Sequence, residues 1–263
     1  MTRNVQSSRP FRIVTDRGCN LPPWLARRFD LIIYPEHRLP EKGDVLFVHS
    51  SAQVGDEVAG LLREFCAAAE AVGAAASCAD ATDEDSAASS SGGAGRRFLA
   101  VDTLSLGLGA GRVIMEACEV REAGGSLHDV VRWVEDNRLT ACQWFAVPDQ
   151  ANLMHVNDLG ELEVTSLRAG LGEPDESAEV AGLSEVRGLK PLLEEFKNRA
   201  RTPYDEHSVS IMHHDNLEAA AELAQNLDTM FGVNKPMLYD INQGLADLLG
   251  PGTVGLQFWG GPR

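Results

Sequence analysis

The chain has 263 residues, 44% of them hydrophobic, which predicts a folded protein larger than a usual single domain. No apolar run is long enough to span a bilayer, and the first residues lack the apolar core of a secretory signal, so we expect a cytoplasmic protein without integral membrane contact. The formal net charge of −16 argues against nucleic-acid binding, because an acidic surface repels phosphate backbones.

Strands and helices alternate through the first half of the chain. Apolar runs predict buried strands over residues 12–15, 31–34, 44–49, 97–101 and 142–147. Helices are expected between them, one opened by Pro22, others over 53–72 and 108–123, and one capped by Ser126 with Asp129 three residues later. This alternation predicts a mainly parallel sheet with helices on both faces.

The segment from Gly73 to Gly95 differs in composition from its surroundings. It contains no aromatic residue and no valine, leucine or isoleucine, and it includes a cluster of acids. Such a segment buries too little apolar surface to offset its ordering entropy. It is therefore predicted to be a flexible surface insertion.

The second half of the chain follows a looser pattern after Pro148. Strands are expected over 162–167, 208–213, 236–241 and 253–258, with an acidic loop over 170–182 and helices over 188–199, 215–231 and 243–249. Asp215 is the expected cap of the long helix. We therefore predict a two-domain α/β protein, with an N-terminal domain over 1–148, its insertion at 73–95, and a smaller C-terminal α/β domain over 149–263.

Motifs for metal, nucleotide and nucleophilic chemistry are missing from the sequence. The five scattered cysteines form no CxxC pair and suggest reduced thiols, and adjacent His213 and His214 on a strand point to opposite faces, which disfavours a shared metal. Glycines 107, 109 and 111 begin a helix, but Arg112 stands where a dinucleotide fingerprint needs its third glycine. No metal, cofactor or catalytic residue is predicted.

Ser50 and Ser51 form the most informative polar pair. They follow a predicted parallel strand and precede a helix, the edge at which α/β sheets place ligands. Hydroxyls and free backbone N–H groups at that edge can hold a carboxylate without positive charge. Two alternatives stay open, a serine that only caps the helix, and an enzyme that uses His49, Ser51 and Asp102.

Several short motifs, in order, resemble the DegV family of bacterial lipid-binding proteins. The family's Thr-Asp-Ser-Gly and Leu-Pro helix start is similar to residues 15–22, with Arg17 in the serine position. The family's Ser-Ser, Asp-Ser turn with Gly-x-Gly, and Val-Arg-Gly segments are similar to residues 50–51, 102–109 and 186–188. The closing Gly-Pro-Gly-Thr motif is similar to residues 250–253, preceded by Leu248 where the family commonly has histidine.

The resemblance implies a long-chain fatty acid held between two domains and presented to a fatty acid kinase, by a protein that is not itself an enzyme. It places the carboxylate on Ser50 and Ser51, with Thr103 as a supporting hydroxyl at the next strand end. The family's Thr-Ser-Gln-Pro and Gly-Gly-Arg-Ile segments are missing here. The alternative is therefore a ligand-free relative that acts as an interaction or regulatory protein.

Overall fold

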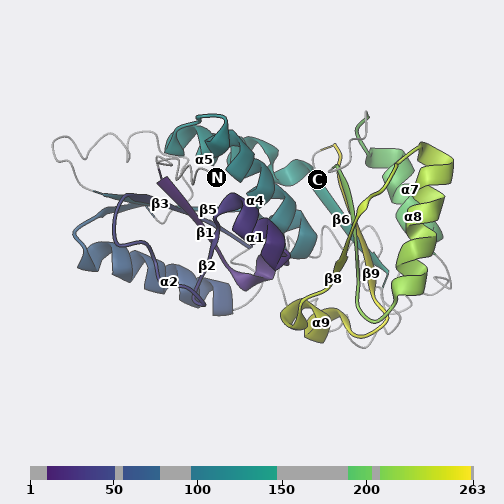
Figure 1. Ribbon diagram of the computed structural model, residues 1–263, viewed down its shortest axis with the longest axis horizontal. Coiled ribbons are helices and arrows are strands. Elements are labelled where there is room, and N and C mark those ends of the chain that lie inside the picture. Colours follow the sequence, from purple (N-terminus) through teal and green to yellow (C-terminus); the bar gives the residue numbers. More distant parts are fainter. Residues whose placement is uncertain (1–10, 51–55, 78–95, 147–188, 203–207, 262–263) are drawn as a thin grey trace, which may run out of the picture.

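The computed structural model describes residues 11–50, 56–77, 96–146, 189–202 and 208–261. Two β-sheets lie side by side, each with helices packed against it (Figure 1). We refer to the five-stranded sheet as sheet A and to the four-stranded sheet as sheet B. The predicted two-part α/β architecture is confirmed.

Sheet A is built from the first part of the chain and is entirely parallel. Its strands lie in the order β2-β1-β3-β5-β4, and each neighbouring pair is parallel. Their bounds are β1 Phe11–Thr15, β2 Ile32–Ile33, β3 Asp44–His49, β4 Ala75–Ser77 and β5 Arg97–Asp102. Strands β1 and β3 are almost fully buried, as expected of a parallel sheet covered on both sides.

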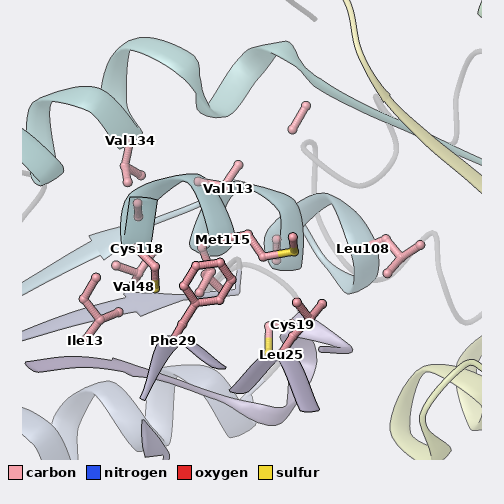
Figure 2. Close-up of a cluster of buried hydrophobic side chains, with 14 of the residues drawn as sticks. Ile13, Cys19, Leu25, Phe29, Val48, Leu108, Val113, Met115, Cys118 and Val134 are labelled. Carbon is pink, nitrogen blue, oxygen red and sulfur yellow. The ribbon is translucent and has the colours of Figure 1, made fainter. Parts of the chain in front are cut away.

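Helices cover both faces of sheet A, as predicted. On one face lie α1 (Pro23–Phe29), α4 (Gly107–Glu122) and α5 (Leu127–Asn137), and α2 (Asp56–Ala71) packs on the other. In Figure 2, strand residues Ile13 and Val48 point toward the α4 side chains and Phe29. Short 3₁₀ turns, η1 (Arg17–Cys19) and η2 (Arg138–Thr140), follow β1 and α5.

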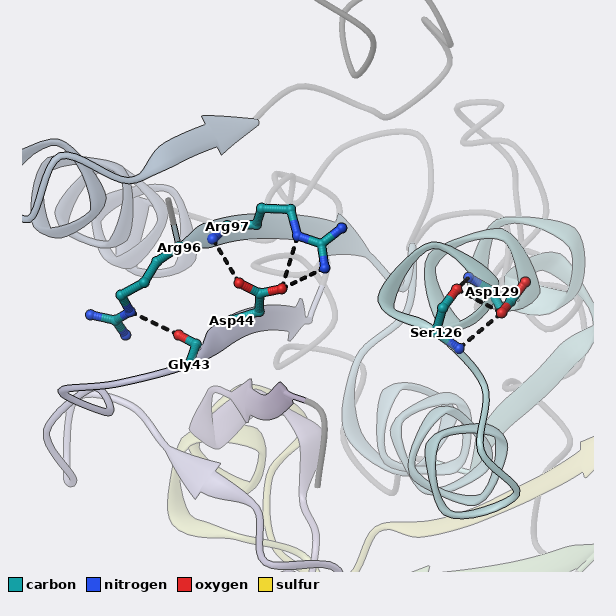
Figure 3. A network of polar contacts seen from close by, with 6 residues as sticks. All are labelled: Gly43, Asp44, Arg96, Arg97, Ser126 and Asp129. Carbon is teal, nitrogen blue, oxygen red and sulfur yellow. Dashed lines mark hydrogen bonds and ion pairs between the residues drawn. The ribbon is translucent and has the colours of Figure 1, made fainter. Parts of the chain in front are cut away.

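Local polar contacts fix a strand register and a helix start (Figure 3). Asp44 accepts hydrogen bonds from the Arg97 backbone N–H at 2.9 Å and from its Nε at 2.8 Å, which ties β3 to β5. Ser126 and Asp129 form the predicted capping box of α5, each side chain accepting from the other's backbone N–H. Only the capping box is readable from the sequence, because its determinants are local, whereas Asp44 and Arg97 are 53 positions apart.

The predicted flexible insertion needs a correction at its start. Ala75–Ser77 form the edge strand β4, which pairs in parallel with β5 from Arg97 to Leu99. Backbone pairing with an existing strand compensates for the low strand propensity of these small residues. The remaining residues, 78–95, lie outside the described part of the chain.

Sheet B is mixed, with the strand order β6-β9-β7-β8. Its strands are β6 Ala141–Ala146, β7 Val209–His213, β8 Met237–Asp240 and β9 Val254–Trp259. β9 is antiparallel to β6 and β7, while β7 and β8 are parallel. Helices α7 (Lys190–Arg199) and α8 (Leu217–Phe231) share its apolar cluster, and α9 (Gln243–Leu249) joins β8 to β9.

Strand β6 belongs to sheet B. The alternation of strands and helices predicts that this strand joins the parallel sheet, and that prediction is wrong. The six residues of β6 pair with β9, more than a hundred residues later in the chain. The domain boundary near Pro148 remains a prediction, because residues 147–188 lie outside the described ranges. The strand expected over 162–167 and the acidic loop over 170–182 fall in the same gap.

Two smaller predictions are also corrected. Asn216, not Asp215, caps α8 by accepting from the Ala219 N–H, because Asp215 adopts a left-handed φ of 52°. Cys19, Cys118 and Cys142 are buried and not disulfide-bonded, as expected, but Cys66 is disulfide-bonded. Among the helices that the structure describes, none has the length and apolar character needed to cross a bilayer.

Candidate functional site

The carboxyl ends of β1, β3 and β5 meet at the edge of sheet A that adjoins sheet B. Asp16 directly follows β1 and is 1% exposed. Its two carboxylate oxygens accept hydrogen bonds from the Ser50 N–H at 2.7 Å and the Gly18 N–H at 2.6 Å. Asp16 therefore holds the residue after β3 against the turn after β1.

Ser50 lies in this cluster, and its hydroxyl forms no hydrogen bond to the described residues. The residue is fully buried, and its Oγ has no hydrogen-bond partner among the described residues. A Cβ placed on Gly18 would come within 2.6 Å of that Oγ, so the hydroxyl lies directly against η1. A buried hydroxyl without a partner is costly, and a bound ligand is one explanation of it. Ser51 lies outside the described residues.

Thr103 occupies the neighbouring strand end, as the sequence predicted. β3 and β5 are paired through His49 and Asp102, so Ser50 and Thr103 follow at the next step. The Thr103 N–H donates to the His49 carbonyl at 3.0 Å, and its Oγ1 donates to the Ser105 carbonyl at 3.3 Å. Its hydroxyl can therefore still accept a hydrogen bond, but its proton is already directed at the backbone.

Ser105 is a polar residue at this edge that the sequence did not single out. It is buried, and its Oγ has no partner within the described part of the chain. It precedes α4, whose first residues lie against sheet B. The signal that could have identified it is its position after a strand end and two residues before the Gly107 helix start.

The N-terminus of α4 connects the two sheets. Gly107 has a φ of 59°, and a Cβ there would come within 2.8 Å of the Leu245 side chain of α9. The Gly109 N–H donates to Gln143 Oε1 of β6 at 2.6 Å. The glycines that resembled a nucleotide fingerprint thus permit a close approach between helix and neighbouring side chains, which is the structural role favoured by the sequence.

A second polar contact joins the two parts near η1. Asn20 Oδ1 accepts from the Asn242 N–H at 2.5 Å, and Asn20 Nδ2 donates to the Asp240 carbonyl at 3.3 Å. Asn242 Nδ2 in turn donates to the Arg17 carbonyl at 2.8 Å. Asn242 also caps α9, so this helix is anchored to the turn that carries Gly18. The strand ends of sheet A are thereby held against sheet B.

The alternative enzyme site receives little support from the contacts of its members. His49 Nδ1 lies 2.7 Å from the Ser50 carbonyl oxygen, and Asp102 Oδ1 accepts from the Leu104 N–H at 2.7 Å. These contacts commit one imidazole nitrogen and one carboxylate oxygen to nearby backbone groups. Ser51, the third member, lies outside the described ranges.

The adjacent histidines face different carboxylates. His213 Nε2 lies 3.5 Å from Asp240 Oδ1, whereas His214 Nε2 lies 3.9 Å from Asp215 Oδ2. No group of three or more potential metal ligands occurs among the residues that the structure describes.

Cys19 is expected to resist alkylation in the folded protein. Burial, and secondarily the negative charge of Asp16, raise the pKa of its thiol to about 12. Because only the thiolate reacts, iodoacetamide at about pH 8 should label Cys19 in urea but not in buffer. Peptide mass spectrometry after timed labelling measures this difference. Equal labelling rates in both conditions would show that the thiol is accessible.

The chain is similar to known proteins both in sequence and in fold. No family model matches the chain. A DegV domain-containing protein of Clostridium perfringens is 26% identical over 171 residues, a match that covers 61% of this chain and 57% of that relative's length.

Two solved structures align over nearly the whole chain. A DegV family protein of Corynebacterium glutamicum has a TM-score of 0.64 at 19% identity, covering 97% of this chain and 98% of its own. A Thermus thermophilus DegV family protein, described by its fatty acid binding, has a TM-score of 0.65 at 19% identity, covering 95% of this chain and 99% of its own. These comparisons agree with the resemblance seen in the motifs, because the chain is similar to DegV proteins in sequence over part of its length and in fold over nearly all of it.

Proposed function

We propose that this protein binds a long-chain fatty acid and holds its carboxylate at the strand ends of sheet A, without catalysing a reaction. The observation that carries the proposal is the Ser50 hydroxyl, which is fully buried without a partner among the described residues. A carboxylate oxygen is a strong acceptor for such a donor. Ser51 is proposed as a second donor, and Thr103 as a residue that supports the site.

The surroundings of Ser50 favour an acid with an apolar chain. Its hydroxyl lies beside η1, and Cys19 of that turn belongs to an apolar cluster that also includes Leu108 of α4 and Leu245 of α9. Uncharged donors next to apolar side chains suit a fatty acid. By the family resemblance, the bound acid would be presented to a fatty acid kinase in the cytoplasm.

A ligand-free relative that acts through protein interactions is the second candidate. It is favoured by the close contact of Gly107 with Leu245, and by an apolar cluster that runs from Ile13 in sheet A to Met212 and Tyr239 in sheet B. This packing fills part of the space between the sheets. The two candidates differ in whether the purified protein retains a fatty acid.

Ser50→Ala is expected to weaken fatty acid binding without unfolding the protein. Loss of one buried hydrogen bond to a charged group should reduce stearate affinity by about tenfold. Delipidated protein is titrated with stearate, and the complex is quantified by native mass spectrometry, with thermal unfolding as a check of folding.

Ser126→Ala serves as the matched control, because that hydroxyl caps α5 instead of lying in the strand-end cluster. It should leave stearate affinity unchanged. Equal binding by wild type and Ser50→Ala would remove Ser50 from the site. A wild-type protein that neither co-purifies with nor binds any long-chain acid would favour the ligand-free alternative.

A further inference from the structure

A row of buried polar side chains crosses sheet B. Gln257 of β9 is paired with Gln143 of β6 on one side and with Ser210 of β7 on the other. All three are buried, and Gln257 is 0% exposed. Their strand neighbours, such as Leu256 and Phe258, belong to the apolar cluster under α7 and α8. Because side chains alternate along a strand, the polar row lies on the opposite face, toward α4.

The two residues beside Gln257 have hydrogen bonds of their own. Gln143 Oε1 accepts from the Gly109 N–H at 2.6 Å. Ser210 is hydrogen-bonded to the Tyr239 hydroxyl, a bond that partly opposes the rise of the Tyr239 pKa to about 12 caused by burial. The Tyr239 hydroxyl lies 2.9 Å from Met237 Sδ. These groups therefore have partners within the protein.

Gln257 has no such partner in the part of the chain that the structure describes. Neither its Oε1 nor its Nε2 forms a hydrogen bond to the described residues, although both atoms are buried. An unpaired buried amide destabilises the fold, so its presence at the centre of a sheet calls for an explanation. The missing partner must accept from Nε2 and donate to Oε1. A hydroxyl group does both, whereas a carbonyl only accepts and an ammonium only donates.

The side chains around Gln257 are either apolar or, in the case of Arg112, already paired with a group of opposite charge. Two residues before Gln257 in β9 is Gly255. Phe145 and Met212 pack so closely over it that a Cβ on this glycine would lie within 2.8 Å of both side chains. In the other direction lies Trp259, with the Arg112 guanidinium 5.7 Å from its ring centroid. Arg112 is paired with Glu116. A neutral polar spot between apolar side chains fits a hydroxyl on an apolar chain better than a second charge.

We propose that the acyl ligand is a hydroxylated long-chain fatty acid, whose chain hydroxyl pairs with the amide of Gln257. This inference rests on the proposed function, because it presupposes an acid held at Ser50. It adds a specificity that the strand-end site cannot provide, since Ser50 contacts only the carboxylate. A site built to pair a hydroxyl discriminates against the analogue that lacks it.

The test compares stearic, 10-hydroxystearic and 12-hydroxystearic acids as ligands of delipidated full-length protein. Wild type should bind at least one hydroxy acid about tenfold more tightly than stearate. Gln257→Met should abolish that preference while retaining stearate binding, and Gln257→Leu provides a second variant of different shape. Gln225→Met, at an exposed position of α8, is the matched control and should keep the wild-type preference.

Thermal unfolding of each variant confirms that it is folded. Equal wild-type affinity for all three acids would overturn the hydroxyl inference, leaving buried water as the partner of Gln257, while the proposed fatty acid function stands. A preference that survives in both Gln257 variants would also overturn it. Failure of wild type to bind any of the three acids would overturn the proposed function and this inference together.

Discussion

Gly111→Ala is expected to lower the free energy of unfolding by about 2 kcal/mol, because this glycine allows α4 to touch η1. A Cβ at position 111 would lie 2.5 Å from the Cys19 carbonyl oxygen and 3.1 Å from Leu21 Cδ2. The first of these atoms belongs to the backbone. It cannot move by a rotamer change, and its turn is anchored on both sides by hydrogen bonds of Asp16 and Asn20.

Gly60→Ala is the matched control for this substitution. Gly60 lies in α2, and the nearest atom to its added Cβ is 3.8 Å away, at the end of the Arg63 side chain. With no clash, the helix propensity of alanine should raise stability by about 1 kcal/mol. Urea unfolding followed by circular dichroism measures both variants. Changes in the free energy of unfolding that have the same sign and size in both variants would show that α4 and η1 are not in close contact.

Elements with local determinants were predictable from the sequence. The run Val45–Val48 is apolar at every position, which indicates a strand buried on both faces, and all four residues are buried. The capping pair Ser126 and Asp129 fixes the start of α5 within one turn. Such features need no knowledge of distant parts of the chain.

The pairing of β6 was not predictable in the same way. Its sequence, Ala141–Ala146, has the apolar character of a buried strand in either sheet. Its partner, β9, is encoded at the end of the chain, so only long-range pairing decides which sheet it joins. The predicted cap of α8 was wrong for a different reason, because the left-handed φ of Asp215 shifts the helix start by one residue.

The candidate site also combines features that could be predicted from the sequence with one that could not. The position of Ser50 and Thr103 at one edge of sheet A could be predicted, because parallel strands place their carboxyl ends together and both residues follow such strands. Gln257 lies inside a strand, where a single glutamine between apolar residues normally indicates an exposed position. Only the packing of α4 over sheet B makes it a buried amide without a hydrogen-bond partner among the described residues.

Asp16→Ala is expected to lower the free energy of unfolding by about 3 kcal/mol, because it leaves the buried N–H of Ser50 and the half-buried N–H of Gly18 without acceptors. Both groups lie in the packed turn region, where Ser50 is fully buried. Asp16→Asn should fall between wild type and Asp16→Ala, because its single amide oxygen can replace only one of the two acceptors.

Asp44→Ala provides the comparison, since Asp44 also accepts hydrogen bonds from a neighbouring segment, those of Arg97 (Figure 3). The Arg97 side chain is 49% exposed, so water can replace the lost carboxylate, and the expected loss is only about 1 kcal/mol. Urea unfolding of the three variants measures the differences. The contrast is decisive because burial is what separates the two carboxylates. Similar losses for Asp16→Ala and Asp44→Ala would show that water reaches the strand ends of sheet A, and a carboxylate held there would then gain little from the Ser50 hydroxyl.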